Sequence, residues 1–380
     1  MKVLHINASY KPAFIYGGPT MSVSMLCEQL ALTGVFITVF TTTANGTTEL
    51  EVIKGKPINI DGVNVYYFQR LTKDHTHFSP FLLTRLWKNV KNYDAVHIHA
   101  WWNLVSVLSG LIALTRKVPV VVSARGTLSP YSFSNKNRRI KSIIHNFLGR
   151  PLLNKCHLHV TSEREKLAIL ALIQPRGISA IPNLVKLPVY TKPAVGKPAS
   201  CLKLIFFSRI DEKKGLDILL NALPLVTVPY YLTIAGTGND DHINYLKQLA
   251  TDNHIADKIS WTGQQGENKF DLLFEQDLFI LPSYDENFGN SVIESLSVGT
   301  AVLVSQNVGL ADYVQNNKLG WLCETNAASI STAINNISNN CKPELERIRE
   351  QSPAIIYNDF DPRNLVQKYL AMYHQLINHE

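Results

Sequence analysis

Short apolar runs of strand length alternate with helical patterns along most of this 380-residue chain. In the first half, a helix is expected at about Thr20–Leu32. We expect the strands of this half at Val3–Asn7, Val35–Phe40, Val63–Phe68, Ala95–His99, Val118–Ser123 and Leu158–Thr161. Strands that alternate with helices are typical of parallel sheets, because each parallel connection needs a crossover. The first half is therefore predicted to be an open parallel α/β sheet.

A Pro-rich segment, residues 187–200, interrupts this rhythm and reads as a linker between domains. After it, strands are expected at Leu202–Phe207, Tyr230–Ala235, Ile259–Thr262, Leu278–Leu281 and Ala301–Ser305. Helices fit between them at Gly215–Leu223, Asp241–Asp252, Asn268–Glu275 and Ser291–Ser297, and a last helix at Asp361–His379. The predicted fold class is α/β, with two doubly wound domains, residues 1–186 and 201–360. Ligands of such sheets bind at the carboxyl ends of the strands, so the two domains should face each other across a cleft.

Cysteine usage and hydropathy bear on the compartment. The five cysteines are scattered, odd in number and never spaced as CxxC, which argues against a disulfide framework or a zinc ribbon and suits a reducing compartment. No secretory signal is visible, and the longest apolar stretch, Leu104–Leu114, is too short to span a bilayer. We therefore expect a cytoplasmic protein that could still associate with the inner face of a membrane.

Positive charge is concentrated in one window of the chain. Between Asp94 and Glu163 there is no acidic residue, although the net charge of the whole chain is only +7. The nine basic residues of this window are Arg116, Lys117, Arg125, Lys136, Arg138, Arg139, Lys141, Arg150 and Lys155. A local positive field of this kind indicates either an anionic partner or a solubilising surface.

The loop after the expected strand Leu202–Phe207 carries a pattern suited to a phosphate group. Arg209 follows the strand, and Lys214 stands just before Gly215 and a helix. Arginine can hold phosphate oxygens in a bidentate manner, lysine acts as a point charge, and a helix start adds free N–H donors. Lys213 beside Lys214 leaves open which lysine points inward.

A second loop follows the expected strand Leu278–Leu281. It carries Glu286 and Gly289, then opens a helix that contains Glu294. Gly289 lets the backbone approach a ligand, and the N–H groups of Asn290 and Ser291 would be free helix donors. The two carboxylates could accept hydrogen bonds from sugar hydroxyls: Glu294 from a ribose and Glu286 from a second sugar. Either glutamate taken alone could equally be a solvated charge.

Together these motifs resemble glycosyltransferase family 4, which has the GT-B fold. The family's Glu-x7-Glu signature around Phe-Gly is matched by Glu286, Phe288, Gly289 and Glu294, and its Arg…Lys-Gly loop by residues 209–215. Three further fragments resemble the family, namely Tyr16-Gly17-Gly18-Pro19, Ile181-Pro182-Asn183 and Ile234-Ala235-Gly236-Thr237-Gly238. The resemblance covers nearly the whole chain and is stronger in its second half.

The resemblance implies a retaining, metal-independent hexosyltransferase. Its donor would be a nucleotide diphosphate sugar, with UDP as the common base in the family, and no cofactor would be needed. Arg209 and Lys214 would neutralise the diphosphate, Glu294 would bind the ribose, and Glu286 would contact the donor sugar. The remaining implied donor contacts are Gly17, Gly18, Phe288, Gly289, Asn290 and Ser291. The last helix, residues 361–380, would pack back on the first domain, which would bind the acceptor.

The first half contributes less specific candidates for acceptor or sugar contacts, namely His99, Trp102 and Arg125. His97 and His99 share a strand face, a spacing that could suit a metal, but no third ligand is evident and core packing is the better prediction. Of the two, His99 is nearer the strand's carboxyl end. Many family members resemble the segment around Arg125 but carry histidine before the glycine. The pattern RGxLxP found here is similar to members tied to surface polysaccharides, so a glycan or polyprenyl-diphosphate-linked acceptor is expected.

Residues 134–150 predict a basic amphipathic helix. Its apolar residues follow helical spacing, and we predict that this stripe faces the core. They are Ile140, Ile143, Ile144, Phe147 and Leu148. Its basic residues could meet an anionic membrane surface that carries a polyprenyl-diphosphate acceptor.

Other functions remain open at this point. A sugar-nucleotide epimerase or a glycan phosphorylase could use the same scaffold, and a catalytically silent relative would retain the fold alone. A nucleic-acid-binding protein could use the basic window, but no helix-turn-helix, zinc-finger or RNA-binding signature accompanies it, so no nucleic-acid partner is expected.

Overall fold

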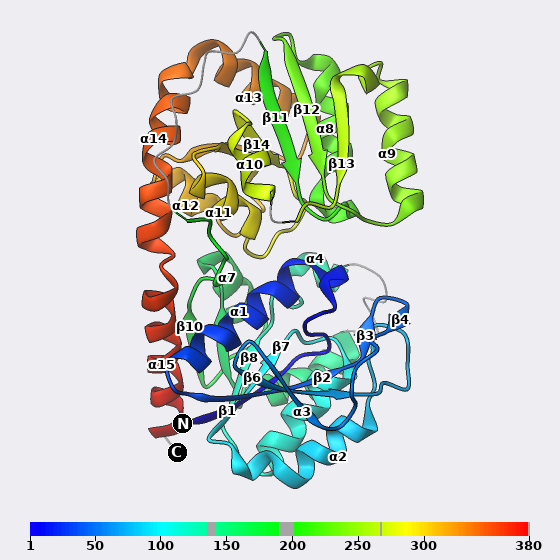
Figure 1. The fold of residues 1–380 in the computed structure, drawn as a ribbon, viewed down its shortest axis with the longest axis vertical. Coiled ribbons are helices and arrows are strands. Elements are labelled where there is room, and N and C mark those ends of the chain that lie inside the picture. The colour runs from blue at the N-terminus through cyan, green and yellow to red at the C-terminus, as the bar shows by residue number, and fades with distance from the viewer. Residues whose placement is uncertain (135–141, 190–200, 267, 379–380) are drawn as a thin grey trace. The chain divides into compact units, whose positions relative to one another are not determined.

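The computed structural model describes residues 1–134, 142–189, 201–266 and 268–378, and it divides into two compact units. The first unit comprises Met1–Leu184 together with Pro362–Glu380, and the second comprises Val185–Asp361. The last helix, α15 (Pro362–Asn378), therefore belongs to the first unit although it follows the second in sequence (Figure 1). Most of the predicted linker, residues 190–200, lies outside the described residues.

The first unit is built on one twisted sheet with the strand order β10-β9-β8-β7-β1-β2-β6-β5. All neighbours are parallel except the edge pair β5 and β6. The strands are β1 (Lys2–Ile6), β2 (Phe36–Thr42), β5 (Pro57–Ile60), β6 (Val63–Phe68), β7 (Ala95–His99), β8 (Val120–Ser123), β9 (His157–Val160) and β10 (Gly177–Ala180). The chain starts in β1, builds outward through β2, and returns to the other side of β1 at β7. The topological switch point is therefore between β1 and β7, where ligands of open α/β sheets bind.

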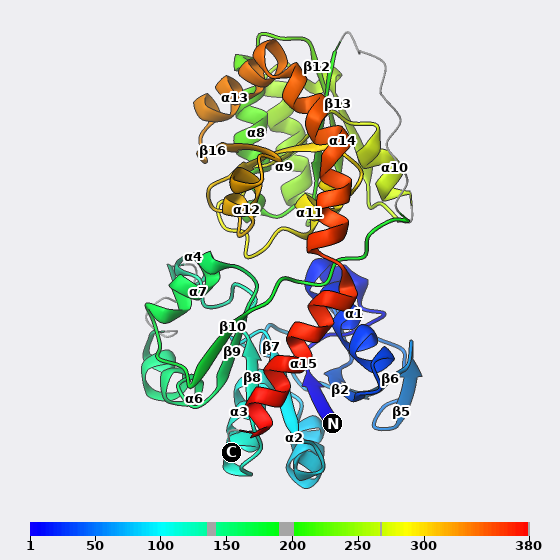
Figure 2. The same ribbon diagram turned by 90° about the vertical axis from the view of Figure 1, so that its left-hand side faces the viewer.

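Helices cover both faces of this sheet, and a small hairpin of β3 (Ala44–Asn45) and β4 (Thr48–Glu49) lies beyond β2. The helices are α1 (Gly18–Leu32), α2 (Pro80–Asn89), α3 (Leu104–Thr115), α4 (Pro130–Ser134), α6 (Arg150–Leu153) and α7 (Glu163–Leu170), with short turns η1 (Phe14–Tyr16), η2 (Val90–Asn92) and η3 (His145–Gly149). Side-chain caps fix the N-termini of two of these helices. The Ser79 side chain accepts a hydrogen bond from the N–H of Leu82 in α2, and that of Asn103 accepts one from the N–H of Ser106 in α3. Helix α15 packs beside α1 (Figure 2).

The second unit contains an all-parallel sheet with the order β13-β12-β11-β14-β15-β16. Its strands are β11 (Leu202–Phe207), β12 (Tyr230–Ala235), β13 (Ile259–Gly263), β14 (Leu278–Leu281), β15 (Ala301–Ser305) and β16 (Gly320–Cys323). The helices are α8 (Leu216–Ala222), α9 (Asp240–Asp252), α10 (Lys269–Phe274), α11 (Asn290–Ser297), α12 (Ala311–Asn316), α13 (Ala327–Asn340) and α14 (Lys342–Asp359), with turns η4 (Glu212–Lys214), η5 (Leu223–Leu225) and η6 (Ala256–Lys258). In this sheet the chain builds outward from β11 through β12 and β13, and then continues on the other side of β11 from β14. The loops after β11 and β14 therefore flank the switch point.

Two parallel α/β sheets confirm the predicted fold class. Central strands such as β7 and β14 are buried along their whole length, as expected for strands covered on both faces. Strands β6, β7, β11, β12, β14 and β15 have the predicted bounds. The edge strands β5, β10 and β16 had not been predicted, because their mixed burial gives no continuous apolar run.

The prediction that the stripe within residues 134–150 faces the core was wrong. Ile143, Ile144 and Phe147 are 59%, 44% and 83% exposed, and Leu148 is also exposed. The described part of this segment passes through the π-helical turn η3, which turns His145 and Gly149 inward instead. Gly149 packs beside Trp101, where a Cβ would be 3.5 Å from the indole nitrogen, in ordinary van der Waals contact. Ile140, Lys136, Arg138, Arg139 and Lys141 lie outside the described residues.

Within the described residues, no helix is long and apolar enough to cross a membrane.

Candidate functional site

At the switch point of the second unit, the loops after β11 and β14 are joined by backbone contacts. The N–H of Tyr284 donates to the carbonyl oxygen of Lys213 at 2.8 Å. Gly215 adopts φ 71°, and a Cβ there would collide with the carbonyl oxygen of Pro282. Only glycine allows this close approach in the left-handed region. The two loops that carry the predicted diphosphate residues therefore form one structural unit.

The close approach of the loops brings Lys214 and Glu286 into an ion pair between Nζ and Oε2, with both side chains largely buried. The lysine that points inward is thus Lys214, while Lys213 contributes its carbonyl group. Burial favours a higher pKa for Glu286, but the Lys214 ammonium, assisted by Lys213 and the N–H of Phe288, holds the pKa below its usual value. Glu286 is therefore a carboxylate and Lys214 its counter-ion.

The backbone of Glu286 is fixed from its other side by the loop after β15. Its N–H donates to the carbonyl of Asn307 at 3.1 Å, and its own carbonyl accepts from the N–H of Gly309 at 2.8 Å. A Cβ on Gly309 would collide with the Asn287 carbonyl oxygen. Gly309 is thus required for this arrangement, and no local motif in the sequence marks it.

A second ion pair lies one turn into helix α11. Glu294 Oε1 is 2.6 Å from Lys269 Nζ at the start of α10. Burial raises the pKa of Glu294, and Lys269 only partly opposes this effect. Sequence reasoning missed Lys269, because it belongs to no motif and approaches Glu294 only through the packing of α10 against α11.

The start of α11 presents the remaining predicted residues of this unit. Gly289 caps the helix in the left-handed region at φ 99°, and Asn290 and Ser291 form its first turn with partly exposed side chains. The Phe288 side chain is buried and packs edge-on against Phe360, with ring centroids 6.2 Å apart. Phe288 can therefore contact a ligand through its backbone but not through its ring.

Arg209 extends from the end of β11 with a side chain that is 46% exposed, and its Nη2 is 3.2 Å from Asp211. Its loop is supported by Gly236 and Gly238, where a Cβ would collide with the carbonyl oxygens of Ser208 and Ile210. The second unit thus places two cationic side chains, Arg209 and Lys214, on one loop beside two carboxylates and a helix start. This arrangement can bind an anionic group together with a hydroxyl-bearing one.

In the first unit, the switch point between β1 and β7 is occupied by imidazole rings. His5 pairs in register with His97, and His99 lies two residues further along β7. All three are fully buried, and His5 Nδ1 lies 2.9 Å from His99 Nε2. His99 was a candidate for contacts with the acceptor or a sugar, but no part of its side chain is exposed, so it can act only through its neighbours.

Two tyrosines of α15 extend this cluster into a hydrogen-bonded network. The Tyr373 hydroxyl lies 2.6 Å from His97 Nδ1, whose Nε2 lies 2.6 Å from Ser123 Oγ. Ser123 also contacts His159 Nδ1 at 2.6 Å, and Tyr369 contacts His159 Nε2 at 3.0 Å. Burial lowers the pKa of all these histidines, to about 3 for His5 and His159, so the rings are neutral at physiological pH.

Neutral imidazoles are metal ligands, and His5 supplies the third histidine that the sequence had not revealed. The geometry nevertheless favours hydrogen bonding. Two nitrogens bound to one tetrahedral zinc ion are about 3.3 Å apart, whereas those of His5 and His99 are separated by a hydrogen-bond distance. The other nitrogen of His99 accepts from the fixed cation Arg125 at 3.4 Å, which would repel a metal ion.

Arg125 follows β8 in the left-handed region at φ 51°, and Gly126 continues the turn at φ 77°. The turn is held by Glu165, which accepts from the N–H of Gly126 at 3.0 Å and from the N–H of Thr161 at 2.8 Å. Nearby, the indole N–H of Trp102 donates to the Thr127 carbonyl at 2.6 Å, and Trp101 is buried in the core. Arg125 also donates a hydrogen bond to Ser22 of α1, a helix whose N-cap is Gly17 (φ 64°) and whose first residue is the exposed Gly18.

Two family profiles match the chain: "Glycosyltransferase Family 4" over residues 16–187 and "Glycosyl transferases group 1" over residues 191–354. A curated relative, the D-inositol 3-phosphate glycosyltransferase of Mycobacteroides abscessus, is 26% identical over 332 residues, covering 81% of this chain and 74% of the relative. Among solved structures, sucrose-phosphate synthase from Thermosynechococcus elongatus aligns with a TM-score of 0.79 at 18% identity, with both chains fully covered. Anabaena HepE, solved in complex with UDP and glucose, aligns with a TM-score of 0.74 at 18% identity, covering 99% of this chain and 100% of HepE.

Proposed function

Because this chain belongs to glycosyltransferase family 4 and has the GT-B fold, we propose that it transfers a hexose or N-acetylhexosamine from a UDP-sugar, with retention of configuration. The observation that carries this proposal is the joined pair of loops at the switch point of the second unit, with the ion pairs Lys214–Glu286 and Lys269–Glu294. The complex of HepE with UDP and glucose supports UDP as the nucleotide.

In this proposal, Lys214 and Arg209 stabilise the diphosphate leaving group. Negative charge grows on the diphosphate as the glycosidic bond breaks, and fixed cations in a partly dry site stabilise that charge strongly. Lys214 exchanges Glu286 for phosphate oxygens, while the exposed Arg209 leaves Asp211. The N–H groups at the start of α11, at Asn290 and Ser291, add dipolar stabilisation. These cations supply the charge that a divalent metal would otherwise bring, so we propose that neither a metal nor a cofactor is needed.

The two carboxylates bind hydroxyl groups in this scheme. Glu294 accepts hydrogen bonds from the ribose, with Lys269 holding the carboxylate in place. Glu286, once released from Lys214, accepts from the transferred sugar near its reacting face. The acceptor hydroxyl attacks from the face that the diphosphate leaves, and its proton passes to a phosphate oxygen. Retention follows from this same-face geometry.

For the acceptor we propose a glycan or a polyprenyl-diphosphate-linked glycan of surface polysaccharide synthesis, bound by the first unit. Trp102 and Arg125 are the candidate contacts there. The acid-free basic window and the exposed Ile143 and Phe147 support peripheral association with an anionic membrane on its cytoplasmic face.

The test is an acceptor-dependent release of UDP. The enzyme is incubated in EDTA with UDP-glucose or UDP-N-acetylglucosamine, with and without a polyprenyl-diphosphate-linked glycan. The proposal expects UDP release that requires the acceptor and is unchanged by EDTA, and a product whose new linkage has the α configuration of the donor. UDP-sugar epimerisation without release, or a product of inverted configuration, would contradict it.

A further inference from the structure

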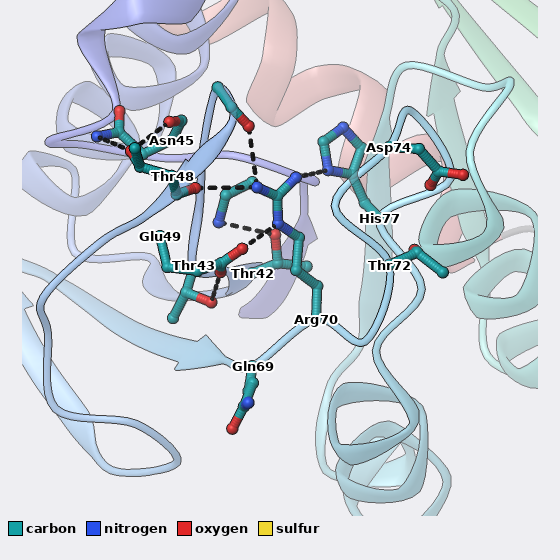
Figure 3. Close-up of polar contacts among 12 residues, drawn as sticks. Thr42, Thr43, Asn45, Thr48, Glu49, Gln69, Arg70, Thr72, Asp74 and His77 are labelled. Atoms are coloured by element: carbon teal, nitrogen blue, oxygen red, sulfur yellow. Dashed lines mark hydrogen bonds and ion pairs between the residues drawn. The ribbon is translucent and has the colours of Figure 1, made fainter.

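Arg70 and Arg125 of the first unit both donate hydrogen bonds to protein groups, but only Arg70 forms an ion pair within the described residues. Arg70 is 4% exposed and pairs with a carboxylate: its Nε lies 2.6 Å from Glu49 Oε1 (Figure 3). Its Nη2 donates to the carbonyls of Gly46 and Thr48 at 2.9 Å each, and its Nη1 meets His77. Arg70 is thus neutralised and saturated, and its role is to hold the β3–β4 hairpin.

Arg125 forms no such ion pair within the described residues. Its hydrogen bonds go to three neutral acceptors: His99 Nδ1 at 3.4 Å from Nε, and Ser22 Oγ and Asn183 Oδ1 at 3.0 and 3.1 Å from Nη1. In the described part of the chain, no carboxylate pairs with Arg125 and its Nη2 donates no hydrogen bond. Glu165, a nearby carboxylate, is engaged with backbone N–H groups of Gly126 and Thr161. The guanidinium is only partly exposed, and burial outweighs the favourable electrostatic effect of Glu165, so the pKa of Arg125 is lowered and its charge is only partly compensated.

A desolvated charge that forms no ion pair is costly, and a bound anion would offset that cost. The position of Arg125 is also fixed by its surroundings. Its backbone stands in the left-handed region, which disfavours any side chain, and Glu165 fixes the turn. His99 and His5, kept neutral by burial, orient the guanidinium without neutralising it. A neutral partner at this position leaves the charge free for a ligand.

We propose that Arg125 recognises an anionic group, a carboxylate or a phosphate, on the acceptor. This inference rests on the proposed function, in which the donor diphosphate belongs to Arg209 and Lys214 of the second unit. The planar guanidinium suits both anions, since each offers two oxygens to a bidentate donor. A neutral sugar hydroxyl would not compensate the charge.

The experiment measures anion binding with the donor site already filled. Thermal shifts of the full chain, in EDTA and saturating UDP, are recorded against malonate and against inorganic phosphate, at ionic strength held constant with sodium chloride. We expect a saturable rise in Tm with one or both anions, and the more effective anion identifies the source as carboxylate or phosphate. In Arg125→Gln, anion affinity should fall at least about tenfold, while UDP affinity by calorimetry stays within about twofold of wild type.

Arg116→Gln is the matched control, because Arg116 lies in the same basic window but precedes β8, whereas Arg125 follows it. This control should retain the anion response. Arg125→Lys keeps the charge without the planar fork and should bind anions more weakly than wild type, which provides a second test if Arg125→Gln does not fold.

Absence of a saturable shift, or a shift that Arg125→Gln retains, overturns the inference. A loss of UDP affinity in Arg125→Gln would reassign the residue to the donor. Failure of the wild type to bind UDP would count against the proposed function instead.

Discussion

Lys214 and Glu286 are 72 positions apart in sequence, yet their side chains form an ion pair at the switch point of the second sheet. The pair exists because Gly215 lets the loop after β11 pass against the carbonyl of Pro282 at the end of β14. Each partner holds the other in a partly buried position. In the proposed mechanism, a ligand replaces one of them, so the pairing would preset both a cation for the diphosphate and a carboxylate for the sugar.

Replacing Lys214 with alanine should chiefly lower turnover. The leaving-group charge grows in the transition state, so loss of a fixed cation should reduce kcat by about 100-fold or more, with a smaller change in KM. Steady-state kinetics of UDP release measure this. The neighbouring Lys213→Ala is the control, because the backbone carbonyl of Lys213 rather than its ammonium makes the loop contact. Equal losses in both variants would contradict the assignment of Lys214.

Replacing Lys269 with methionine should weaken nucleotide binding although Lys269 belongs to no motif. Without the ammonium 2.6 Å away, Glu294 is buried without its counter-ion and its pKa rises further. We expect UDP affinity to fall about tenfold, as measured by calorimetry at pH 7, with recovery at higher pH as Glu294 ionises. A pH-independent loss would argue that Lys269 contacts the nucleotide itself.

Glu286 and Glu294 should contribute to stability with opposite dependences on pH. The folded-state pKa of Glu286 is lowered, so its contribution is present above its ordinary pKa and is lost as pH falls through the folded value. The folded-state pKa of Glu294 is raised, so the folded chain favours the protonated acid and loses that preference as pH rises through the raised value.

Urea unfolding of Glu286→Gln and Glu294→Gln between pH 3 and pH 7 tests this directly. Relative to wild type, Glu286→Gln should become less stable as pH rises, and Glu294→Gln more stable. Parallel trends in the two variants would refute the assigned pKa directions.

Gly215→Ala should disrupt the site more than an equivalent change elsewhere. A Cβ at Gly215 collides with the Pro282 carbonyl oxygen, whereas Gly263, at a similar positive φ of 66°, has open space. Gly263→Ala therefore carries only the left-handed strain, about 1 kcal/mol. We expect Gly215→Ala to lose both stability and turnover, and Gly263→Ala to keep full turnover. Comparable activity in the two variants would mean that the close approach of the loops is not needed.

Tyr373→Phe should loosen the attachment of α15 to the first sheet. The substitution removes the hydroxyl group that is hydrogen-bonded to His97 Nδ1 and leaves this buried ring nitrogen unpaired, which should lower the free energy of unfolding by about 1–3 kcal/mol. The exposed neighbour His374 provides the control, since His374→Ala should change the free energy of unfolding by less than about 0.5 kcal/mol. Urea denaturation measures both, and an unchanged Tyr373→Phe would show that apolar packing alone holds the helix.

Local patterns were sufficient to predict the central strands, because apolar runs and loop residues report on a strand's own neighbourhood, but not the edge strands β5, β10 and β16. Partners brought together by packing were not predictable in this way. His5 meets His99 across 94 positions, Tyr373 meets His97 across 276, and Lys269 meets Glu294 only where α10 packs on α11. The stripe at Ile143 and Phe147 illustrates a different limit: periodicity locates an apolar face but does not say what covers it, and here solvent does.

The most direct test of the central claim is calorimetric titration with UDP, GDP, ADP and CMP in EDTA. The account predicts saturable binding of UDP that is indifferent to EDTA, falls about tenfold or more in Glu294→Ala, and is unchanged when the exposed Glu344 is replaced by alanine. If no nucleotide binds, or if UDP binds equally well to Glu294→Ala, the donor site does not lie at the switch point of the second unit.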